Sequence, residues 1–351
     1  MAEPQTGIHA RPRTSFGTTW FGTLTIVVLV VLAAVAVGFV AMRQFAAPAD
    51  SDGGSAANLA VQPSLDPKRA IGNIVKLCDF GPRPSGSEGM RQQQEFLRAR
   101  FSELGGTVRW QDFADRHPVT GATVQLRNMI VSFGPQTGER VLVCAHYDTR
   151  PFPDLDPRKP KGRFVGANDG ASGVALLLEL AHAFKEQPPE IGVDLILFDG
   201  EEFVFDNDDE YFLGSSYFAR DYRGTKDGPR YRAGVLVDMI GDKDLEILYE
   251  VFSYKLATEV TQRLWQIADE RKIDAFVPRL GYELRDDHLP LNQIAGIPTC
   301  DVIDFDYPSR GRRGVQYWHT TEDTPDKCSG KSVCAVAGVV LQWVLEQKPA
   351  P

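Results

Sequence analysis

The sequence predicts an α/β protein, a three-layer sandwich in which helices flank a central, mostly parallel mixed sheet, preceded by one transmembrane helix. Three observations predict this fold. Apolar runs that look like strands alternate with segments of helical periodicity between residues 91 and 241. Several of these runs are almost entirely apolar, which is typical of strands buried on both faces of a parallel sheet. One long uncharged segment stands near the N-terminus.

The uncharged segment "WFGTLTIVVLVVLAAVAVGFVAM", residues 20–42, is long enough to cross the hydrocarbon core of a bilayer. The apolar region of a signal peptide is usually shorter, so an uncleaved anchor is favoured, although "FAAPADS" leaves cleavage open. Arg11 and Arg13 precede the segment, and this slight positive bias places the N-terminus in the cytoplasm. The rest of the chain is then extracytoplasmic, in a periplasmic, extracellular or lumenal compartment.

The domain organisation follows from composition. We expect a short cytoplasmic tail at 1–19, the anchor at 20–42, a flexible linker rich in Ala, Ser, Gly and Pro at 43–66, and one folded domain at 67–351. A net charge of −9 argues against a nucleic-acid partner. The five cysteines show no CxxC spacing, and small buried side chains are favoured over a local Cys328–Cys334 disulfide.

Within the folded domain, helices and strands alternate after a turn cluster, "GPRPSGSEGM". Helical spacing with a terminal Gly predicts a first helix over 91–105, and the run 139–148 is so apolar that we expect a central strand. The full set of expected elements is a helix at 91–105, strands at 127–134 and 139–148, a helix at 170–184, a strand at 192–202, a helix at 211–222 and a strand at 233–241.

Five segments interrupt apolar runs with side chains that can hold a metal ion. They contain His146 with Asp148, Asp169, Glu201 with Glu202, Asp238, and His319. In α/β sheets, ligands bind at the carboxyl ends of the strands, where these clusters are expected to lie. Imidazole and carboxylate without thiolate suit Zn²⁺, and ligands from separate loops usually leave a position open for chemistry. A catalytic zinc site is therefore predicted.

The spacing of these residues suggests which of them bind the metal ion and which have other roles. His146 and Asp148 are two apart on a strand and point to one face, so His146 can bind metal while Asp148 accepts a hydrogen bond from its other ring nitrogen. Glu201 and Glu202 are adjacent and project differently, so one is expected to bind metal and the other to transfer protons. Taken singly, each of these residues could equally be a turn cap or a core side chain, and it is their number that favours a site.

The motifs resemble the zinc aminopeptidase-like superfamily and, within it, the animal-type glutaminyl-peptide cyclotransferases. The resemblance spans about Pro67 to Leu345 and is carried by "GPRPSGSEG", "HYDT", "FVGANDGASGVALLLELA", "FDGEE", "LGSSYFA", "VDMIG", "LRDDHLPL" and "WHTTED". It implies one zinc bound by the residues matching Asp169, Glu202 and His319. By this resemblance, the substrates of the protein would be peptide or protein N-termini. Its reaction would be the cyclisation of N-terminal glutamine to pyroglutamate with release of ammonia. The membrane anchor is similar to that of the Golgi-resident members.

The resemblance also assigns roles around the zinc. Glu201 matches the general acid/base, Asp238 and Asp286 match acidic partners in a hydrogen-bond network, and Trp318 matches the indole that lines the substrate pocket. Two positions depart from the animal pattern. No Trp follows the double Glu in "FVFDNDDEY", and Asp301 stands where those enzymes have a histidine.

Two alternatives stay open at this point. His146 and Asp238 complete the two-zinc set of the aminopeptidases, with Asp169 bridging, so a di-zinc aminopeptidase fits the same residues. In the cyclases, His146 would instead be a neighbour of a single zinc. A catalytically silent domain of the same fold is a further alternative. The charged stretches 154–163 and 206–210 are interpreted as solvent-facing loops, and the oligomeric state does not follow from the sequence.

Overall fold

The computed structural model describes residues 65–206, 208–226, 228–308 and 316–349. The predicted cytoplasmic tail, the anchor at 20–42 and all of the predicted linker except its last two residues lie outside these ranges. Within the described ranges, no helix is long and apolar enough to cross a membrane.

Six strands form one mixed sheet, in the order β1-β2-β4-β3-β5-β8. The four strands β4, β3, β5 and β8 run parallel, whereas β2 pairs antiparallel with both β4 and β1. The predicted mostly parallel mixed sheet is confirmed, and β3 is central as expected. The strands are β1 (Thr107–Arg116), β2 (Thr123–Phe133), β3 (Glu139–His146), β4 (Gly192–Phe198), β5 (Arg230–Asp238) and β8 (Thr299–Ile303).

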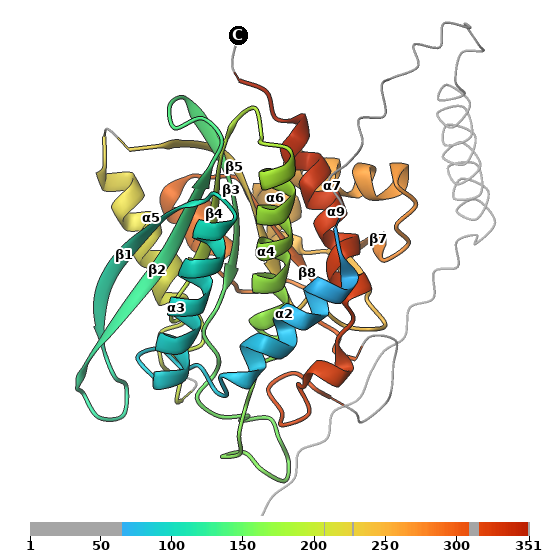
Figure 1. The fold of residues 1–351 in the computed structure, drawn as a ribbon. Coiled ribbons are helices and arrows are strands. Elements are labelled where there is room, and N and C mark those ends of the chain that lie inside the picture. The colour runs from blue at the N-terminus through green and yellow to red at the C-terminus, as the bar shows by residue number, and fades with distance from the viewer. Residues whose placement is uncertain (1–64, 207, 227, 309–315, 350–351) are drawn as a thin grey trace, which may run out of the picture. The chain divides into compact units, whose positions relative to one another are not determined.

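Helices cover both faces of this sheet, which confirms the three-layer sandwich (Figure 1). One face carries α2 (Pro67–Asp79), α3 (Glu88–Glu103), α4 (Ala171–Glu186), α7 (Thr258–Glu270) and α9 (Gly330–Glu346). The other carries α5 (Leu213–Gly224), α8 (His288–Pro290) and the π-helical turn η1 (Leu291–Ala295). The remaining elements are β6 (Ile247–Tyr249) and β7 (Phe276–Leu280), which pair in parallel, α6 (Val251–Leu256) and the 3₁₀ turn η2 (Pro325–Lys327).

The apolar run of β3 serves both layers. Val141, Val143 and Ala145 belong to the larger core under α4 and α9, whereas Leu142 and Cys144 belong to the smaller core under α5. Because successive side chains of a strand point to opposite faces, a strand covered on both sides must be apolar throughout. Burial on both faces therefore explains why the sequence of β3 is continuously apolar.

The sequence analysis did not predict strand β1 or helix α2. The edge strand β1 alternates exposed and buried residues and carries four charged side chains, which protects a sheet edge from pairing with other chains. Helix α2 starts with Pro67, and Asp66 caps it by accepting hydrogen bonds from Lys68 and Arg69. Leu65, the first described residue, also packs on the main core.

The cysteines behave as the sequence indicated. All five lie in the described part of the chain, none forms a disulfide, and four are buried while Cys334 is partly exposed. The alternative Cys328–Cys334 disulfide is not present in this structure.

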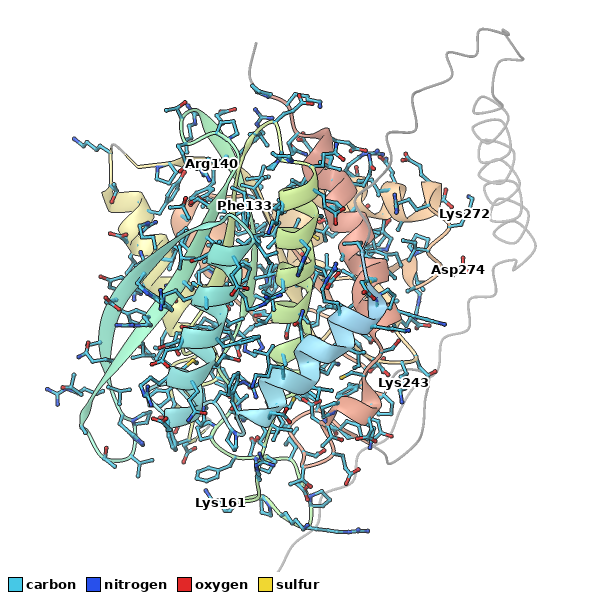
Figure 2. The ribbon with its side chains drawn as sticks, in the orientation of Figure 1. Phe133, Arg140, Lys161, Lys243, Lys272 and Asp274 are labelled. Atoms are coloured by element: carbon cyan, nitrogen blue, oxygen red, sulfur yellow. The ribbon has the colours of Figure 1, made fainter. Side chains whose placement is uncertain are left out.

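A buried ion pair stabilises the sheet near the amino ends of its parallel strands. Arg140 donates two hydrogen bonds to Asp194, from Nε to Oδ2 at 2.9 Å and from Nη2 to Oδ1 at 2.7 Å. The hydroxyls of Tyr231 and Ser132 donate to the same carboxylate at 2.6 and 2.5 Å. Figure 2 shows Arg140 beside Phe133, at the opposite end of the domain from Lys161. The pair is therefore fully hydrogen-bonded and far from the carboxyl edge of the sheet.

We expect Asp194→Ala to lower the free energy of unfolding by ~3–5 kcal/mol, because it leaves the Arg140 guanidinium buried without its counter-charge. Denaturant unfolding monitored by circular dichroism measures this loss. Asp269→Ala is the control, since its exposed carboxylate pairs only with exposed Lys272 in the described structure and should change stability by less than ~0.5 kcal/mol. Equal stability of Asp194→Ala and the control would contradict a structural role for the buried pair.

Candidate active site

The predicted site residues gather at the carboxyl edge of the parallel strands. His146 ends β3, Asp238 ends β5, and Glu201 and Glu202 follow β4 after a turn at Gly200. Asp169 lies two residues before the first residue of α4. The sheet therefore brings together side chains that are far apart in the sequence, as expected for this fold.

Two glycines let the loops approach closely enough to form the site. Gly170 precedes α4 with φ of 97°, and a Cβ there would lie 2.8 Å from the carbonyl oxygen of Asp148 and 3.2 Å from Cε1 of His146. Gly200 has φ of 74°, and a Cβ there would lie 2.6 Å from Leu126. Other residues would be strained and would clash at these positions.

The three predicted zinc ligands form a compact cluster. Asp169, Glu202 and His319 each offer one ligand atom, and these atoms lie within 4.8 Å of one another. Nε2 of His319 lies 2.8 Å from Oε1 of Glu202 and 3.5 Å from Oδ2 of Asp169. All three residues are buried. The structure thus places one imidazole and two carboxylates around a common point.

The cluster fits a divalent cation. Oδ2 of Asp169 is buried and has no hydrogen-bond partner among the described residues, although a buried carboxylate oxygen normally requires one. Burial together with the charge of Glu202 raises the pKa of Asp169 to about 6. A bound cation would favour the charged form and reverse this shift. Oxygen and imidazole donors without thiolate suit Zn²⁺.

His146 lies on the other side of Asp169. Its Nε2 is 3.3 Å from Oδ1 of Asp169 and 3.2 Å from Oδ1 of Asp238, and the three residues form a second possible metal cluster. The Asp169 carboxylate therefore faces His146 with one oxygen and His319 with the other. This bridging layout accommodates one ion with His146 as a neighbour, or two ions, so the geometry keeps both alternatives open.

Glu201 lies next to the predicted ligands but is not one of them, and it offers a carboxylate oxygen within 4.8 Å of ligand atoms of Glu202 and His146. Its Oε2 lies 3.9 Å from Nδ1 of His146, and its side chain is 13% exposed, toward the cavity described below. Burial raises the pKa of Glu201 well above its ordinary value, while the charge of His146 lowers it. The two neighbouring glutamates thus occupy different environments, which agrees with the predicted division of roles.

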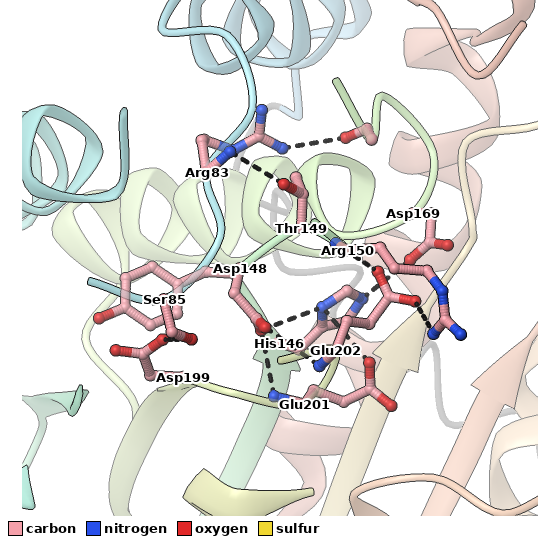
Figure 3. A network of polar contacts seen from close by, with 12 residues as sticks. Arg83, Ser85, His146, Asp148, Thr149, Arg150, Asp169, Asp199, Glu201 and Glu202 are labelled. Atoms are coloured by element: carbon pink, nitrogen blue, oxygen red, sulfur yellow. Dashed lines mark hydrogen bonds and ion pairs between the residues drawn. The ribbon is translucent and has the colours of Figure 1, made fainter. Parts of the chain in front are cut away.

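Asp148 acts differently from the sequence prediction. Its Oδ1 lies 3.6 Å from Nδ1 of His146, and that nitrogen makes no hydrogen bond with the described residues. Instead, the two carboxylate oxygens of Asp148 accept hydrogen bonds from the backbone N–H groups of Glu201 at 3.2 Å and Glu202 at 3.0 Å (Figure 3). Asp148 therefore positions the turn that carries both glutamates. Strand alternation predicts direction but not which of several nearby donors the carboxylate reaches.

The "GPRPSGSEG" motif supports the same loops from outside the cluster. The buried guanidinium of Arg83 donates to the backbone carbonyls of Val165 at 2.7 Å and Gly166 at 3.1 Å, on the segment that leads to Asp169. Ser85 donates to Asp199 at 2.6 Å, just before the double glutamate (Figure 3). These contacts give the motif a structural role next to the site.

A cavity of about 520 Å³ opens onto the cluster. Its wall includes residues predicted as ligands, as acidic partners and as the pocket indole: Asp169, Glu201, Glu202, Asp238, Asp286, Trp318 and His319. The Trp318 ring lies 4.0 Å from that of His319 and 5.0 Å from that of Phe305, measured between centroids. Burial and the charge of Asp238 raise the pKa of Asp286 well above its ordinary value. The structure thus collects every predicted site residue except His146 in the wall of one cavity, and His146 lies directly behind it.

Two residues at the cavity wall were missed by the sequence analysis. Arg150 donates from its backbone N–H to Oε2 of Glu202 at 3.0 Å, and its guanidinium binds Asp154 at 2.7 and 3.1 Å. Oδ1 of Asp154 lies 3.4 Å from Nδ1 of His319. Asp154 is nevertheless exposed, in agreement with a solvent-facing loop at 154–163, but this interpretation is wrong for Asp156, which is buried and accepts a hydrogen bond from the backbone N–H of Thr321 at 3.0 Å. Composition shows that a loop is charged but not which charge faces inward.

The structure shows the surroundings of the two positions that depart from the animal pattern. In place of the missing Trp, Tyr211 and Phe212 line the cavity. Asp301 is fully buried, and its Oδ2 lies 3.6 Å from Nδ1 of His288. Asp206, Asp208 and Glu210 are exposed, which agrees with a surface loop at 206–210.

The chain is similar to proteins of known family. A model of peptidase family M28 matches residues 128–344, which include all the predicted metal ligands. The chain belongs to peptidase family M28. A glutaminyl-peptide cyclotransferase-like protein from Mus musculus is 27% identical over 310 residues, which cover 80% of this chain and 76% of the mouse protein.

Solved structures extend the M28 comparison. The crystal structure of Fimbriiglobus ruber glutaminyl cyclase is 39% identical with a TM-score of 0.76, and the match covers 86% of this chain and all of that one. A leucine aminopeptidase precursor from Bacteroides thetaiotaomicron is 31% identical with a TM-score of 0.74, over 82% of this chain and 99% of that one. The predicted resemblance to the zinc aminopeptidase-like proteins and their glutaminyl cyclase branch is confirmed, while the roles of single residues stay predictions.

Proposed function

We propose that this chain is a zinc-dependent glutaminyl-peptide cyclotransferase, which converts N-terminal glutamine of peptides or proteins to pyroglutamate and releases ammonia. The similarity to the Fimbriiglobus ruber glutaminyl cyclase over most of the chain supports this choice. The structural observation that carries it is the single cavity onto which Glu201, the three candidate ligands and Trp318 all open. A cavity of about 520 Å³ has room for one glutaminyl residue at the end of a peptide.

Asp169, Glu202 and His319 would hold the metal ion. When bound there, zinc would supply Lewis acidity to the γ-amide carbonyl of the substrate. The protein's own contribution is to hold the α-amine against the γ-carbon, because an intramolecular attack gains much of its rate from correct positioning.

Glu201 is the proton carrier in this proposal. As the bond forms between the α-nitrogen and the γ-amide carbon, the carboxylate of Glu201 takes a proton from that nitrogen. It then gives the proton to the amide nitrogen as the C–N bond breaks, so ammonia leaves and the enzyme returns to its starting state. Its position beside the three ligands, facing the cavity, suits this exchange.

Asp238 and Asp286 would steady the substrate amine, since both carboxyl groups line the cavity close to Glu201. The flat ring of Trp318 would stack on the amide and keep water away, which matters because hydrolysis competes with cyclisation.

The direct test is a product assay on a glutaminyl peptide with metal analysis of the same sample. We expect ammonia and a pyroglutamyl peptide from Gln-Phe-Ala, and one zinc ion per chain. A leucyl peptide is the control and should stay intact. Release of free leucine or free glutamine, without ammonia, would contradict the cyclase proposal.

The second candidate is a di-zinc aminopeptidase, and one observation favours it. Asp169 faces both histidines, so His146, Asp169 and Asp238 could hold another ion beside the first. A two-metal site commonly produces a hydroxide nucleophile for peptide hydrolysis. Two tightly bound zinc ions per chain together with free leucine in the same assay would establish this candidate.

A further inference from the structure

Asp323 joins two segments that each carry a candidate zinc ligand. Its Oδ1 accepts a hydrogen bond from the backbone N–H of Asn168 at 2.8 Å, and its Oδ2 accepts one from the backbone N–H of Asp169 at 3.1 Å. The hydroxyl of Tyr307 also donates to Oδ1, at 3.0 Å. Asp323 is 1% exposed, so water does not compete for these contacts.

The other end of this connection is the turn that carries His319. His319 has a φ of 55°, and the chain folds back after it through hydrogen bonds from Thr320 N–H to Tyr317 at 3.0 Å and from Asp323 N–H to Thr320 at 3.2 Å. His319 and Asp323 therefore belong to one short turned segment. A shift of the Asp323 carboxylate would move His319 with it.

We propose that Asp323 is a positioning residue that sets the separation of Asp169 and His319 and thereby the affinity for zinc. The inference rests on the proposed zinc site, and it holds for the cyclase and the aminopeptidase alike. It assigns Asp323 no contact with substrate or metal.

The position of Asp169 depends on its backbone as well as on its side chain. Its Oδ1 lies 3.3 Å from Nε2 of His146, whereas its Oδ2, the oxygen that faces His319, has no hydrogen-bond partner among the described residues. Asp323 fixes that backbone at two consecutive N–H groups. The Asp323 carboxylate therefore helps to set the 3.5 Å distance between Oδ2 of Asp169 and Nε2 of His319, although the two ligands are far apart in the sequence. Residues that orient metal ligands in this way commonly change affinity strongly when replaced.

The test is the zinc dissociation constant of Asp323→Asn, measured by competition with a chromophoric chelator. An amide offers one acceptor oxygen, and its NH₂ group would face a backbone N–H, so one of the two contacts is lost. We expect zinc binding to weaken by ~10- to 100-fold. The visible spectrum of the cobalt-substituted protein should also change, because the ligand geometry changes.

Two further variants separate positioning from stability. Asp323→Glu keeps the charge and the acceptors but adds a methylene, so it should fold and still show weaker zinc binding and an altered cobalt spectrum. Val336→Ala shortens a buried core side chain in α9, away from the site, and should bind zinc like the wild type despite its lower stability. Wild-type zinc affinity and cobalt spectrum in both Asp323 variants would overturn the inference. Failure of the wild type itself to bind zinc would instead refute the proposed metal site.

Discussion

Replacing Glu201 by Gln should lower kcat about 10²- to 10⁴-fold while the zinc content stays at the wild-type level, because removing a general acid/base has an effect of this size. The amide keeps the shape of the side chain but cannot accept a proton from the substrate amine. The backbone N–H of Glu201 remains bonded to Asp148, so the turn that also carries Glu202 is preserved. Steady-state kinetics on a glutaminyl peptide and metal analysis of the same preparation measure the two quantities.

Glu283→Gln is the matched control for this variant. Glu283 lines the same cavity but is exposed, and its carboxylate lies 3.6 Å from the ammonium of Lys255. Neutralising it should change kcat less than a few-fold. A fall in kcat of less than tenfold in Glu201→Gln would show that Glu201 is not the proton carrier. Loss of zinc from Glu201→Gln would show instead that it serves as a metal ligand.

The sequence predicted the positions of those candidate site residues that follow a buried strand. His146, Asp238 and the Glu201–Glu202 pair each follow an apolar run, and the parallel strands β3, β4 and β5 bring their ends to one edge. Strand periodicity and the topology of α/β sheets are enough to place such residues.

The sequence did not predict what the intervening loops do. Asp156 and Asp323 lie in charged, turn-rich segments and are buried, whereas Arg158 and Glu322 in the same segments are exposed. Asp323 is buried because it accepts two N–H groups of a turn more than 150 positions away in the chain. Such pairings depend on the tertiary structure, which local patterns do not encode. The same limit explains why the prediction placed Asp148 beside His146, where it lies 3.6 Å from Nδ1, but not its hydrogen bonds from the backbone of the two glutamates.

Replacing Glu202 or His319 by Ala should remove the zinc and, with it, the activity. Each change deletes one of three donors at a site whose fourth position is left for substrate, and two remaining protein ligands do not hold zinc tightly. We expect zinc content after dialysis to fall from one ion per chain to near zero, with no detectable turnover. Atomic absorption and the ammonia assay measure the two results.

The fold should survive both changes, which makes the loss of zinc interpretable. Without Glu202, the Arg150 guanidinium still binds Asp154 through two hydrogen bonds, so no buried cation is left unpaired. The charge of Glu202 is also one cause of the raised pKa of Asp169, so its removal makes Asp169 easier to ionise. Loss of zinc from Glu202→Ala therefore could not be explained by protonation of Asp169.

His182→Ala is the control for the histidine variant, because His182 is a partly exposed side chain on α4 and should leave the zinc content unchanged. Circular dichroism and thermal unfolding establish that each variant is folded before its metal is measured. Retention of one zinc ion by both folded variants would place the metal elsewhere, for example at the cluster of His146, Asp169 and Asp238. Retention of zinc by Glu202→Ala but not by His319→Ala would exchange the roles of the two glutamates. Glu201 belongs to a cluster with His146 and Glu202, so it is near enough to replace Glu202 as a ligand.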